Sequence, residues 1–488
     1  MILRVIIDNL YSFNRTMEFN MFTNKSQRHL EHKRHIGKIA YLKMAAIYGA
    51  NGAGKSNMIK VLELLKKMVI GGTVFSYLDN LKFKLDNECQ ERCSSIAVEF
   101  VVEGHVYFYT ISFDSSGVYY ESLSETLASD EDRLVFEREY ADGKENISFY
   151  KGYCDDPKNK LFVEMLADKF LGRRDVLLTM LQEKYGNEFV ETKVVFKWFY
   201  DTLHIVHGSE QISPIAHVFG SDKSLLDFGN KLVSTLSTGV EGIKTIRYDV
   251  ERNEKNVEIF DRLENNPNSV LEKFDPYTGD RINYVKEGDK VIAESIRTTH
   301  ADKEGQGVAF NIGMESDGTQ RLVDYIPMLN GILKRGEIYV VDEIERSIHP
   351  SVIKELVRLV ADDKNMNGQL VFSTHETCLL DQEILRTDEI WFAQKNAHGS
   401  TELYSLSDFN VHSTANVENG YLNGRYGGIP FMNELKTLHW DERINIWLDQ
   451  GDMSGLSHLV ILARFIFIVR ETEGSLITSN SSVGYLLM

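Results

Sequence analysis

The sequence predicts an α/β protein with a mixed sheet, an antiparallel β-lobe and a helical insertion. Three stretches carry the α/β prediction. The first is AAIYGANGAGKSN, residues 45–57, a short apolar run followed by a glycine-rich loop and a helical apolar pattern. The second is GEIYVVDEIERSIHP, residues 336–350, an apolar run that ends in two acids. The third is QLVFSTHETCLLD, residues 369–381, an apolar run that ends in Ser-Thr-His. Ligands gather at the carboxyl ends of parallel strands, so these three ends are expected to share a site.

The first stretch matches the phosphate-binding pattern G-x-x-x-x-G-K-[ST] over residues 49–56 without a mismatch. Its glycines let the backbone approach a phosphate, so that N–H groups and the helix N-terminus face the negative charge. Lys55 is expected to reach the β- and γ-phosphates, and the Ser56 hydroxyl is expected to ligate Mg²⁺. The predicted nucleotide-binding residues of this loop (P-loop) are Gly49, Ala50, Asn51, Gly52, Ala53, Gly54, Lys55, Ser56 and Asn57.

The second and third stretches supply the chemistry that ATP hydrolysis needs. Asp342, at the end of its apolar run, is the predicted Mg²⁺ ligand, and Glu343 is the predicted general base for the attacking water. His375 follows the next strand and is placed to touch the γ-phosphate. Lys55, Glu343 and His375 are therefore the candidate catalytic residues, with ATP and Mg²⁺ as the expected cofactors.

A helix precedes the second stretch, within GMESDGTQRLVDYIPMLNGILKRG, residues 313–336. Ser316-Asp317-Gly318-Thr319 opens this helix, so its N–H groups and hydroxyls form a second anion site. Because the P-loop already holds the chain's own nucleotide, Ser316 and Gly318 are expected to serve a nucleotide bound by another subunit. The sequence therefore predicts a homo-oligomer, at least a dimer, with nucleotide at the subunit interfaces.

The order of these motifs resembles the ABC-type ATPase heads of the SMC, RecF and OLD group. The quoted stretches, with ESDGTQRL and GRYGGIPF (residues 424–431), resemble the AAA15/AAA21-type prokaryotic ATPases. That family includes RloA-like, AbiL-like and PARIS-type ATPases, which are associated with defence against phage. The resemblance covers about residues 1–70 and 305–431. It implies a P-loop NTPase of ABC-ATPase type, a D-loop at SIHP in which Ser347 contacts nucleotide, and a role in antiphage defence.

Four regions are expected along the chain. Residues 1–125 form an N-terminal ATPase lobe that contains the P-loop and an antiparallel meander at 96–125. Residues 126–304 form a largely helical insertion, of which 251–304 are polar and turn-rich and are expected to be a surface excursion. Residues 305–431 form the C-terminal ATPase lobe, and residues 432–488 form a helical appendage. No stretch sustains the heptads of a long coiled coil.

The charge and the apolar runs of the sequence limit which partners and which cellular location we expect. The net charge of −18 argues against a surface that binds nucleic acid everywhere, although a basic segment at residues 24–38 allows local contact. The longest apolar run, residues 459–469, is short and carries Arg464, so no membrane span is predicted. MILRVIIDNL lacks the features of a signal peptide, which leads us to expect a cytoplasmic protein. The four cysteines are expected to be free thiols.

Three functions compete. The first is an ATP-hydrolysing sensor or scaffold of antiphage defence that controls a separate effector, such as a Toprim-type nuclease. The second is a DNA repair or recombination ATPase like RecF, which the acidic charge disfavours and the basic segment allows. The third is a nuclease in its own right. It lacks support, because the region after His375 has no Asp-x-Asp metal motif and too little chain for a full nuclease domain.

Overall fold

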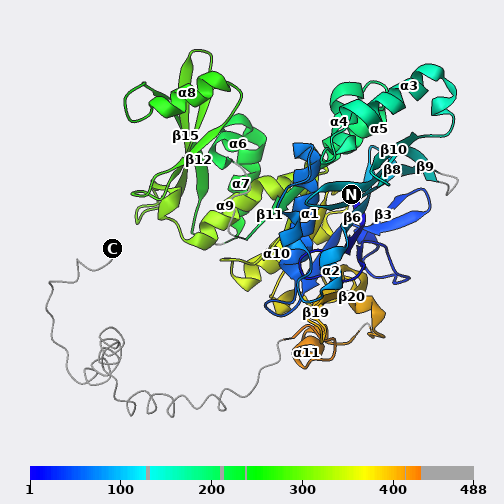
Figure 1. The fold of residues 1–488 in the computed structure, drawn as a ribbon. Helices are drawn as coiled ribbons and strands as arrows, with labels where there is room; N and C mark the ends of the chain where they lie inside the picture. Colours follow the sequence, from blue (N-terminus) through cyan, green and yellow to red (C-terminus); the bar gives the residue numbers. More distant parts are fainter. Residues whose placement is uncertain (128–131, 209–213, 237–238, 413, 430–488) are drawn as a thin grey trace, which may run out of the picture. The chain divides into compact units, whose positions relative to one another are not determined.

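A six-stranded sheet forms the centre of the ATPase fold in the computed structural model (Figure 1). The three apolar runs of the sequence form neighbouring parallel strands, which confirms that prediction. Each is buried along its whole length, which explains why these runs are continuously apolar. The strand order is β11-β17-β18-β5-β19-β20, and only β20 is antiparallel to its neighbour. The strands are β5 (Met44–Tyr48), β11 (Leu203–Val206), β17 (Ile338–Val341), β18 (Gln369–Ser373), β19 (Ile390–Lys395) and β20 (Thr401–Ser405).

A seven-stranded antiparallel sheet forms the β-lobe, in the order β10-β9-β8-β7-β6-β1-β2. It contains the predicted meander, and it continues past the expected boundary at residue 125 through two further strands. Its strands are β1 (Ile2–Asp8), β2 (Met17–Asn20), β6 (Ser94–Val102), β7 (His105–Asp114), β8 (Gly117–Thr126), β9 (Asp132–Ala141) and β10 (Lys144–Phe149). A separate two-stranded sheet pairs β3 (Lys33–Ile36) with β4 (Ile39–Leu42).

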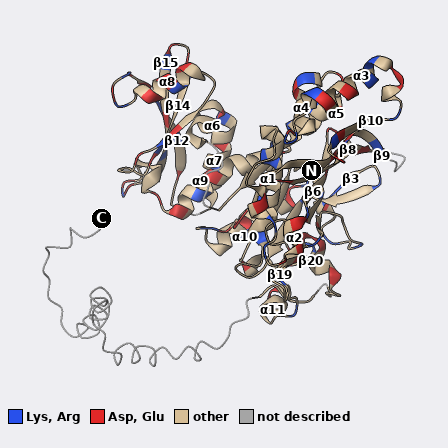
Figure 2. Ribbon diagram, in the orientation of Figure 1, with Lys and Arg blue, Asp and Glu red and all other residues tan. Residues whose placement is uncertain are grey.

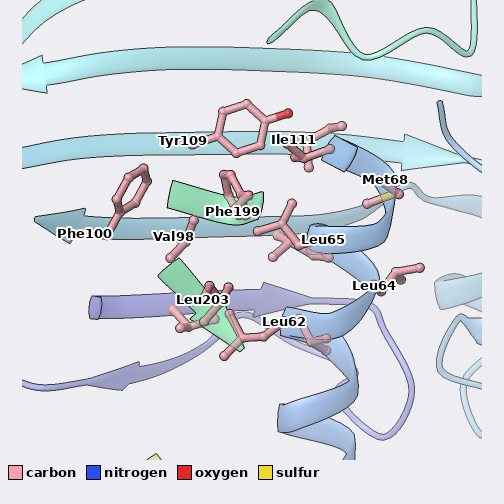
Figure 3. Packing of buried hydrophobic residues seen from close by; sticks show 14 of the residues in the cluster. Leu62, Leu64, Leu65, Met68, Val98, Phe100, Tyr109, Ile111, Phe199 and Leu203 are labelled. Atoms are coloured by element: carbon pink, nitrogen blue, oxygen red, sulfur yellow. The ribbon is translucent and has the colours of Figure 1, made fainter. Parts of the chain in front are cut away.

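Helix α1 (Lys55–Gly71) begins at the P-loop lysine and packs against the β-lobe. Apolar side chains at helical spacing give it a buried face, which meets the inward side chains of β6 and β7 (Figure 3). The helix ends at Gly72, which adopts the left-handed conformation that favours glycine. The packed residues labelled in the figure are Leu62, Leu64, Leu65, Met68, Val98, Phe100, Tyr109, Ile111, Phe199 and Leu203.

The region expected to be a largely helical insertion is mixed, and this expectation was wrong. Its helices are α3 (Pro157–Met165), α4 (Leu177–Tyr185), α5 (Val190–Lys197), α6 (Ile215–Ser221), α7 (Lys223–Thr235) and α8 (Val257–Asn265). A five-stranded antiparallel sheet replaces the expected surface excursion. Its strands are β12 (Gly242–Val250), β13 (Leu271–Phe274), β14 (Arg281–Glu287), β15 (Lys290–Ala301) and β16 (Gly307–Asn311).

The insertion sheet is rich in charged residues, and several of these form ion pairs between neighbouring strands. Arg247 pairs with Glu294, Lys290 bonds to Asp249, and Arg281 lies 3.5 Å from Glu272. Opposite charges on neighbouring strands stabilise a sheet, although the same residues read as a solvated loop when the pairing is unknown.

Helix α9 (Asp317–Asn330) lies between two hydrophobic clusters. Leu322, Tyr325 and Leu329 belong to the cluster of the central sheet, whereas Val323 and Ile326 belong to the cluster of the insertion. Two further helices, α10 (Pro350–Asp362), which follows β17, and α11 (Val417–Leu422), contribute buried residues to the cluster of the central sheet.

The structure describes residues 1–127, 132–208, 214–236, 239–412 and 414–429, all of which belong to one compact unit, Met1–Pro430. The predicted appendage at 432–488, with its apolar run, lies outside the described residues. Within the described ranges, no helix combines the length and apolarity needed to cross a membrane. All four cysteines are free thiols, as predicted.

Candidate nucleotide-binding site

The P-loop connects the end of β5 to the start of α1, as the sequence predicts. Gly52 and Gly54 have φ angles of 77° and 112°, in the left-handed region that glycine adopts most readily. A side chain on Gly49 would place its Cβ only 2.5 Å from the Ala393 carbonyl oxygen. These positions therefore need glycine for the conformation and closeness of the loop, and the N-terminus of α1 follows directly.

A pocket of about 330 Å³ opens over this loop. Two of its lining residues, Glu343 and His375, come from the ends of β17 and β18. All three candidate catalytic residues thus lie in one pocket, although Lys55 is 288 positions from Glu343 and 320 positions from His375 in the chain. Its complete lining is Asn51, Gly52, Ala53, Gly54, Lys55, Ser56, Asn57, Glu343 and His375.

Lys55 is held inside the loop by its own backbone. Its Nζ donates to the carbonyl oxygens of Gly49 (2.8 Å) and Ala50 (3.3 Å), and it lies 3.1 Å from His375 Nε2. Burial lowers the pKa of the Lys55 ammonium, and the nearby carboxylates of Asp342 and Glu343 oppose that shift. The ammonium therefore sits among acceptors at the pocket floor, where phosphate oxygens can replace them.

His375 is arranged to accept a hydrogen bond from Lys55. Burial lowers the pKa of its imidazole, and the positive charge of Lys55 lowers it further. An ammonium has only donors, so the contact requires a lone pair on Nε2 and a neutral ring. The backbone N–H of His375 donates to Glu345 Oε1 at 2.7 Å, which fixes the start of the segment after β18.

Ser373, the last residue of β18, joins the two acids of the neighbouring strand. Its hydroxyl donates to Asp342 Oδ1, and its oxygen accepts from the Glu343 backbone N–H at 2.9 Å. Glu343 has a φ of 52°, a conformation that non-glycine residues rarely adopt and that often marks functional sites. Sequence reasoning placed Ser373 at a strand end but did not assign it this role.

Ser12 and Thr401, which the sequence analysis did not identify, form side-chain hydrogen bonds that hold the P-loop in place. The Thr401 hydroxyl lies 2.8 Å from the Ala53 carbonyl oxygen and 2.8 Å from Ser12 Oγ. The Asn57 side-chain amide donates to the same Ser12 oxygen at 2.8 Å. A Cβ on Gly54 would lie 2.1 Å from Thr401 Oγ1, so this clamp leaves room only for glycine. No local pattern marks residues 12 and 401, because they meet only in the folded chain.

The second predicted anion site lies at the start of α9. Ser316 Oγ accepts from the Thr319 backbone N–H at 3.2 Å and thereby caps the helix. Gly318 packs against the D-loop, where an added Cβ would be 2.6 Å from the Ser347 carbonyl oxygen. Ser316, Gly318 and Ser347 are not among the described residues that line the P-loop pocket. The three residues lie close to one another, because a Cβ on Gly318 would be 2.6 Å from the Ser347 carbonyl oxygen and 3.9 Å from Ser316 Oγ.

Helix α9 is also bonded to the segment that carries the two acids. The Tyr325 hydroxyl donates to the Ile344 carbonyl oxygen at 2.8 Å, and an Arg321 nitrogen lies 3.4 Å from the His207 carbonyl oxygen at the end of β11. A displacement of α9 would therefore pull on the residue that follows Glu343.

Two residues at this site fit a Mg²⁺-nucleotide complex. Ser56 lines the pocket and offers a hydroxyl oxygen. Asp342 is buried and does not line the pocket, but its carboxylate is close enough to Lys55 to act on the pKa of that ammonium. Hard oxygen donors such as these are what Mg²⁺ prefers, usually one or two per site in addition to phosphate oxygens and water.

Two cations of the basic segment 24–38 form hydrogen bonds with backbone carbonyl oxygens of the chain itself. Lys33 Nζ donates to the Ser26 carbonyl oxygen at 2.9 Å, and Arg34 donates to the carbonyl oxygens of Glu31 and Met366 at 3.0 and 2.9 Å. Elsewhere, Lys and Arg residues are interspersed with Asp and Glu along helices such as α3 and α8 (Figure 2). At least two of the cations that could allow local nucleic-acid contact therefore hydrogen-bond to the chain itself.

Strand, P-loop and helix, followed by a capped helix, two acids after a buried strand and a histidine after the next, define a P-loop NTPase of ABC-ATPase type. A comparison with protein families agrees. The chain belongs to the family described as "AAA domain, putative AbiEii toxin, Type IV TA system" (AAA_21), which matches residues 44–163 and 183–381. The assignment to an RloA-like, AbiL-like or PARIS-type subgroup stays a prediction.

Solved structures with a similar arrangement include SMC heads. An SMC head bound to the C-winged helix domain of ScpA is 15% identical, with a TM-score of 0.41, covering 83% of this chain and 97% of its own. The SMC head domain from Thermotoga maritima is 12% identical, with a TM-score of 0.34, covering 83% and 98%. An Smc head with an extended coiled coil, bound to the C-terminal domain of ScpA derived from Pyrococcus furiosus, is 12% identical, with a TM-score of 0.35, covering 83% and 96%. No curated protein matched the sequence.

Proposed function

We propose that this protein binds ATP with Mg²⁺ and hydrolyses it, and that its nucleotide state controls a separate effector in antiphage defence. The observation that carries the ATPase proposal is the convergence of Glu343 and His375 on the P-loop around Lys55. A P-loop that only stored nucleotide would not need a carboxylate and a histidine facing it.

Each residue has a role in this reaction. Lys55 binds the β- and γ-phosphates, exchanging backbone carbonyls for phosphate oxygens. Glu343 accepts the proton of the attacking water, and His375 orients the γ-phosphate. Ser56 and Asp342 would hold Mg²⁺, which supplies charge neutralisation between the phosphates. Ser373 keeps Asp342 and the backbone of Glu343 at a fixed spacing.

We infer that two copies complete each site. Ser316, at the N-cap of α9, offers a hydroxyl and helix N–H groups suited to a γ-phosphate, and it lies outside the lining of its own P-loop pocket. A second copy placed with its α9 over the first pocket would supply these groups. Dimerisation would then depend on ATP, because the γ-phosphate is the shared ligand.

Helix α9 also supports the effector-control part of the proposal. It belongs to the cluster of the central sheet through Tyr325 and to the cluster of the insertion through Val323 and Ile326. Closure of two copies around ATP would therefore change how the insertion is held, and a partner bound to the insertion would bias closure in return. The family description, which names a toxin system, is in line with an ATPase that works beside a second protein.

Two variants test the ATPase proposal. Lys55→Ala is expected to abolish ATP binding because it removes the phosphate contacts. Glu343→Gln is expected to bind ATP normally and to release no phosphate, because only the base is lost. The measurements are nucleotide affinity by calorimetry and phosphate release under steady state. Equal affinity in wild type and Lys55→Ala, or undiminished turnover in Glu343→Gln, would contradict the proposal.

Expression in cells tests the effector. The protein alone is expected to be harmless and to give no protection, whereas co-expression with a partner encoded beside it is expected to reduce phage plating. Glu343→Gln should reduce that protection, because hydrolysis is lost, while leaving protein levels unchanged. ATP-dependent cleavage of DNA or RNA by the purified protein alone, lost in Glu343→Gln, would overturn the separate-effector model.

A further inference from the structure

Three side chains with metal-binding atoms meet at the 3₁₀ turn Leu30–His32 (η1), outside the lining of the nucleotide pocket. The ligand atoms of His29, Glu31 and His32 all lie within 4.8 Å of one another. His29 Nδ1 is 3.3 Å from Glu31 Oε1, and His32 Nε2 is 4.0 Å from the same oxygen. Ligands bound to one tetrahedral ion at about 2.0–2.2 Å lie roughly 3.3 Å apart, so only small side-chain movements close the set.

The opposite nitrogen of each histidine already has a hydrogen-bond acceptor. His29 Nε2 lies 2.9 Å from the Gln382 carbonyl oxygen, and His32 Nδ1 lies 2.9 Å from both carboxylate oxygens of Glu389. Because a carbonyl or carboxylate oxygen only accepts, each of these nitrogens must carry the hydrogen. When both rings are neutral, the lone pairs are on His29 Nδ1 and His32 Nε2, the two atoms that face Glu31. His29 Nδ1 then lies 3.3 Å from another acceptor, Glu31 Oε1, so the contact needs either a second hydrogen on this ring or a cation between the two atoms. Metal-binding histidines are held in this way, by an acceptor on the nitrogen that does not bind the ion.

His32 and Glu389 are buried side by side, and protonation of His32 alone would leave its Nε2–H without a hydrogen-bond acceptor. His32 and Glu389 are both fully buried, and a buried carboxylate needs a positive partner. If His32 were protonated to supply it, its Nε2–H would be a buried donor, yet this atom has no hydrogen-bond partner. The nearby guanidinium of Arg386 is already paired with Asp388 at 2.8 Å. The buried Lys43 ammonium is close enough to Glu389 to interact with its charge, but it donates to the carbonyl oxygens of Ala361 and Asp363 instead. A cation on Nε2 would meet both needs, since it would satisfy the lone pair and balance the charges of Glu389 and Glu31.

We propose that His29, Glu31 and His32 bind a divalent transition-metal ion of the zinc class. Two imidazoles and one carboxylate suit zinc, and the partial exposure of His29 and Glu31 leaves room for a fourth ligand from solvent. Gln382 and Glu389 hold the two rings and lie on the chain between His375 and β19. The ion would therefore fix the two rings, and through their hydrogen bonds it would stabilise the contact between residues 29–32 and the segment that follows His375.

The test uses the full chain, stripped with a chelator and then dialysed against Zn²⁺ or, separately, Mg²⁺. One zinc per chain is expected by elemental analysis, together with a rise in melting temperature that Mg²⁺ does not produce. Binding of Co²⁺ as a probe should give the visible absorption of a four-coordinate site. Glu31→Gln and His29→Gln are expected to weaken zinc binding at least tenfold and to remove the stabilisation.

His35→Ala is the matched control, because His35 is an exposed histidine of the adjoining strand β3 and is not part of the cluster. It should bind zinc as wild type does. Retained ATP binding shows that the Glu31 and His29 variants are folded, since these residues do not line the nucleotide pocket. Zinc binding that is absent from wild type, or that survives undiminished in both variants, overturns the proposal.

Discussion

Among single residues, His375 is expected to make the stability of the protein depend on pH. Burial first, and the Lys55 ammonium second, lower its pKa below the ordinary value of 6.5. The unfolded chain therefore binds the proton more tightly than the folded protein does. The contribution of this residue to stability is complete above about pH 6.5 and is lost progressively as the pH falls below that value.

We expect the imidazole signal that disappears in His375→Gln to titrate below pH 6.5 in the nucleotide-free protein. Removing the neighbouring charge with Lys55→Ala should move that midpoint upward. NMR spectra of protein labelled at histidine, recorded across pH, measure both. A midpoint unchanged by Lys55→Ala would show that the 3.1 Å contact does not set the charge state of His375.

Thr401 gives a second prediction at the residue scale. Thr401→Val keeps the shape of the side chain but removes the hydroxyl beside the Ala53 carbonyl oxygen and Ser12. Leaving buried polar groups without a partner lowers the free energy of unfolding by about 1 to 3 kcal/mol. Urea unfolding measures the loss, and ATP affinity should fall with it because the P-loop is less firmly held. Thr401→Ser retains the hydroxyl and is expected to behave like wild type; an equal loss in both variants would assign the effect to packing.

At the scale of elements, α9 combines a helix cap with a proposed phosphate ligand in one residue. Ser316→Asp keeps a good N-cap and adds a negative charge where the γ-phosphate of a second copy is proposed to bind. It should unfold like wild type yet lose ATP-dependent dimerisation. Ser316→Ala should lose about 0.5 to 2 kcal/mol of stability, because the cap is removed. Its dimerisation should be weakened less than that of Ser316→Asp, because the helix N–H groups remain and no negative charge is added.

Light scattering in the presence of ATP, with Glu343→Gln as the background, measures the dimer. ATP-dependent dimerisation of Ser316→Asp at the wild-type level would exclude Ser316 as a phosphate ligand. The comparison matters because α9 also carries the contacts between the insertion and the central sheet, so a stability defect alone would not identify a ligand.

At the scale of the whole molecule, the proposed ATPase needs two chains. Lys55→Ala and Ser316→Arg chains should each be inactive alone. A mixture should recover part of the wild-type phosphate release, because one of the two interfaces then combines an intact P-loop with an intact α9. Co-purification of differently tagged chains verifies that mixed dimers form. No recovery from verified mixed dimers would argue against nucleotide shared between copies.

The parts of the site that are contiguous in the chain could be predicted from the sequence. The strand, P-loop and helix around Lys55 follow one another directly, and the acids at 342 and 343 directly follow their strand. Backbone geometry over a few residues fixes such units, so spacing and residue type are enough to identify them. The antiparallel meander at 96–125 was predictable for the same reason, since its alternation and turns are local.

Features that depend on contacts between distant parts of the chain could not be predicted and became visible in the folded protein. Ser12 and Thr401 come from opposite ends of the described chain, and nothing near either residue marks it as a support of the P-loop. The insertion sheet was mistaken for a surface excursion because its charges are paired between strands, as Arg247 is with Glu294. His29, Glu31 and His32 are close in sequence, but their value as ligands depends on Gln382 and Glu389, which only folding brings to them. Partners of this kind are selected by packing of the whole chain, and no local pattern contains that information.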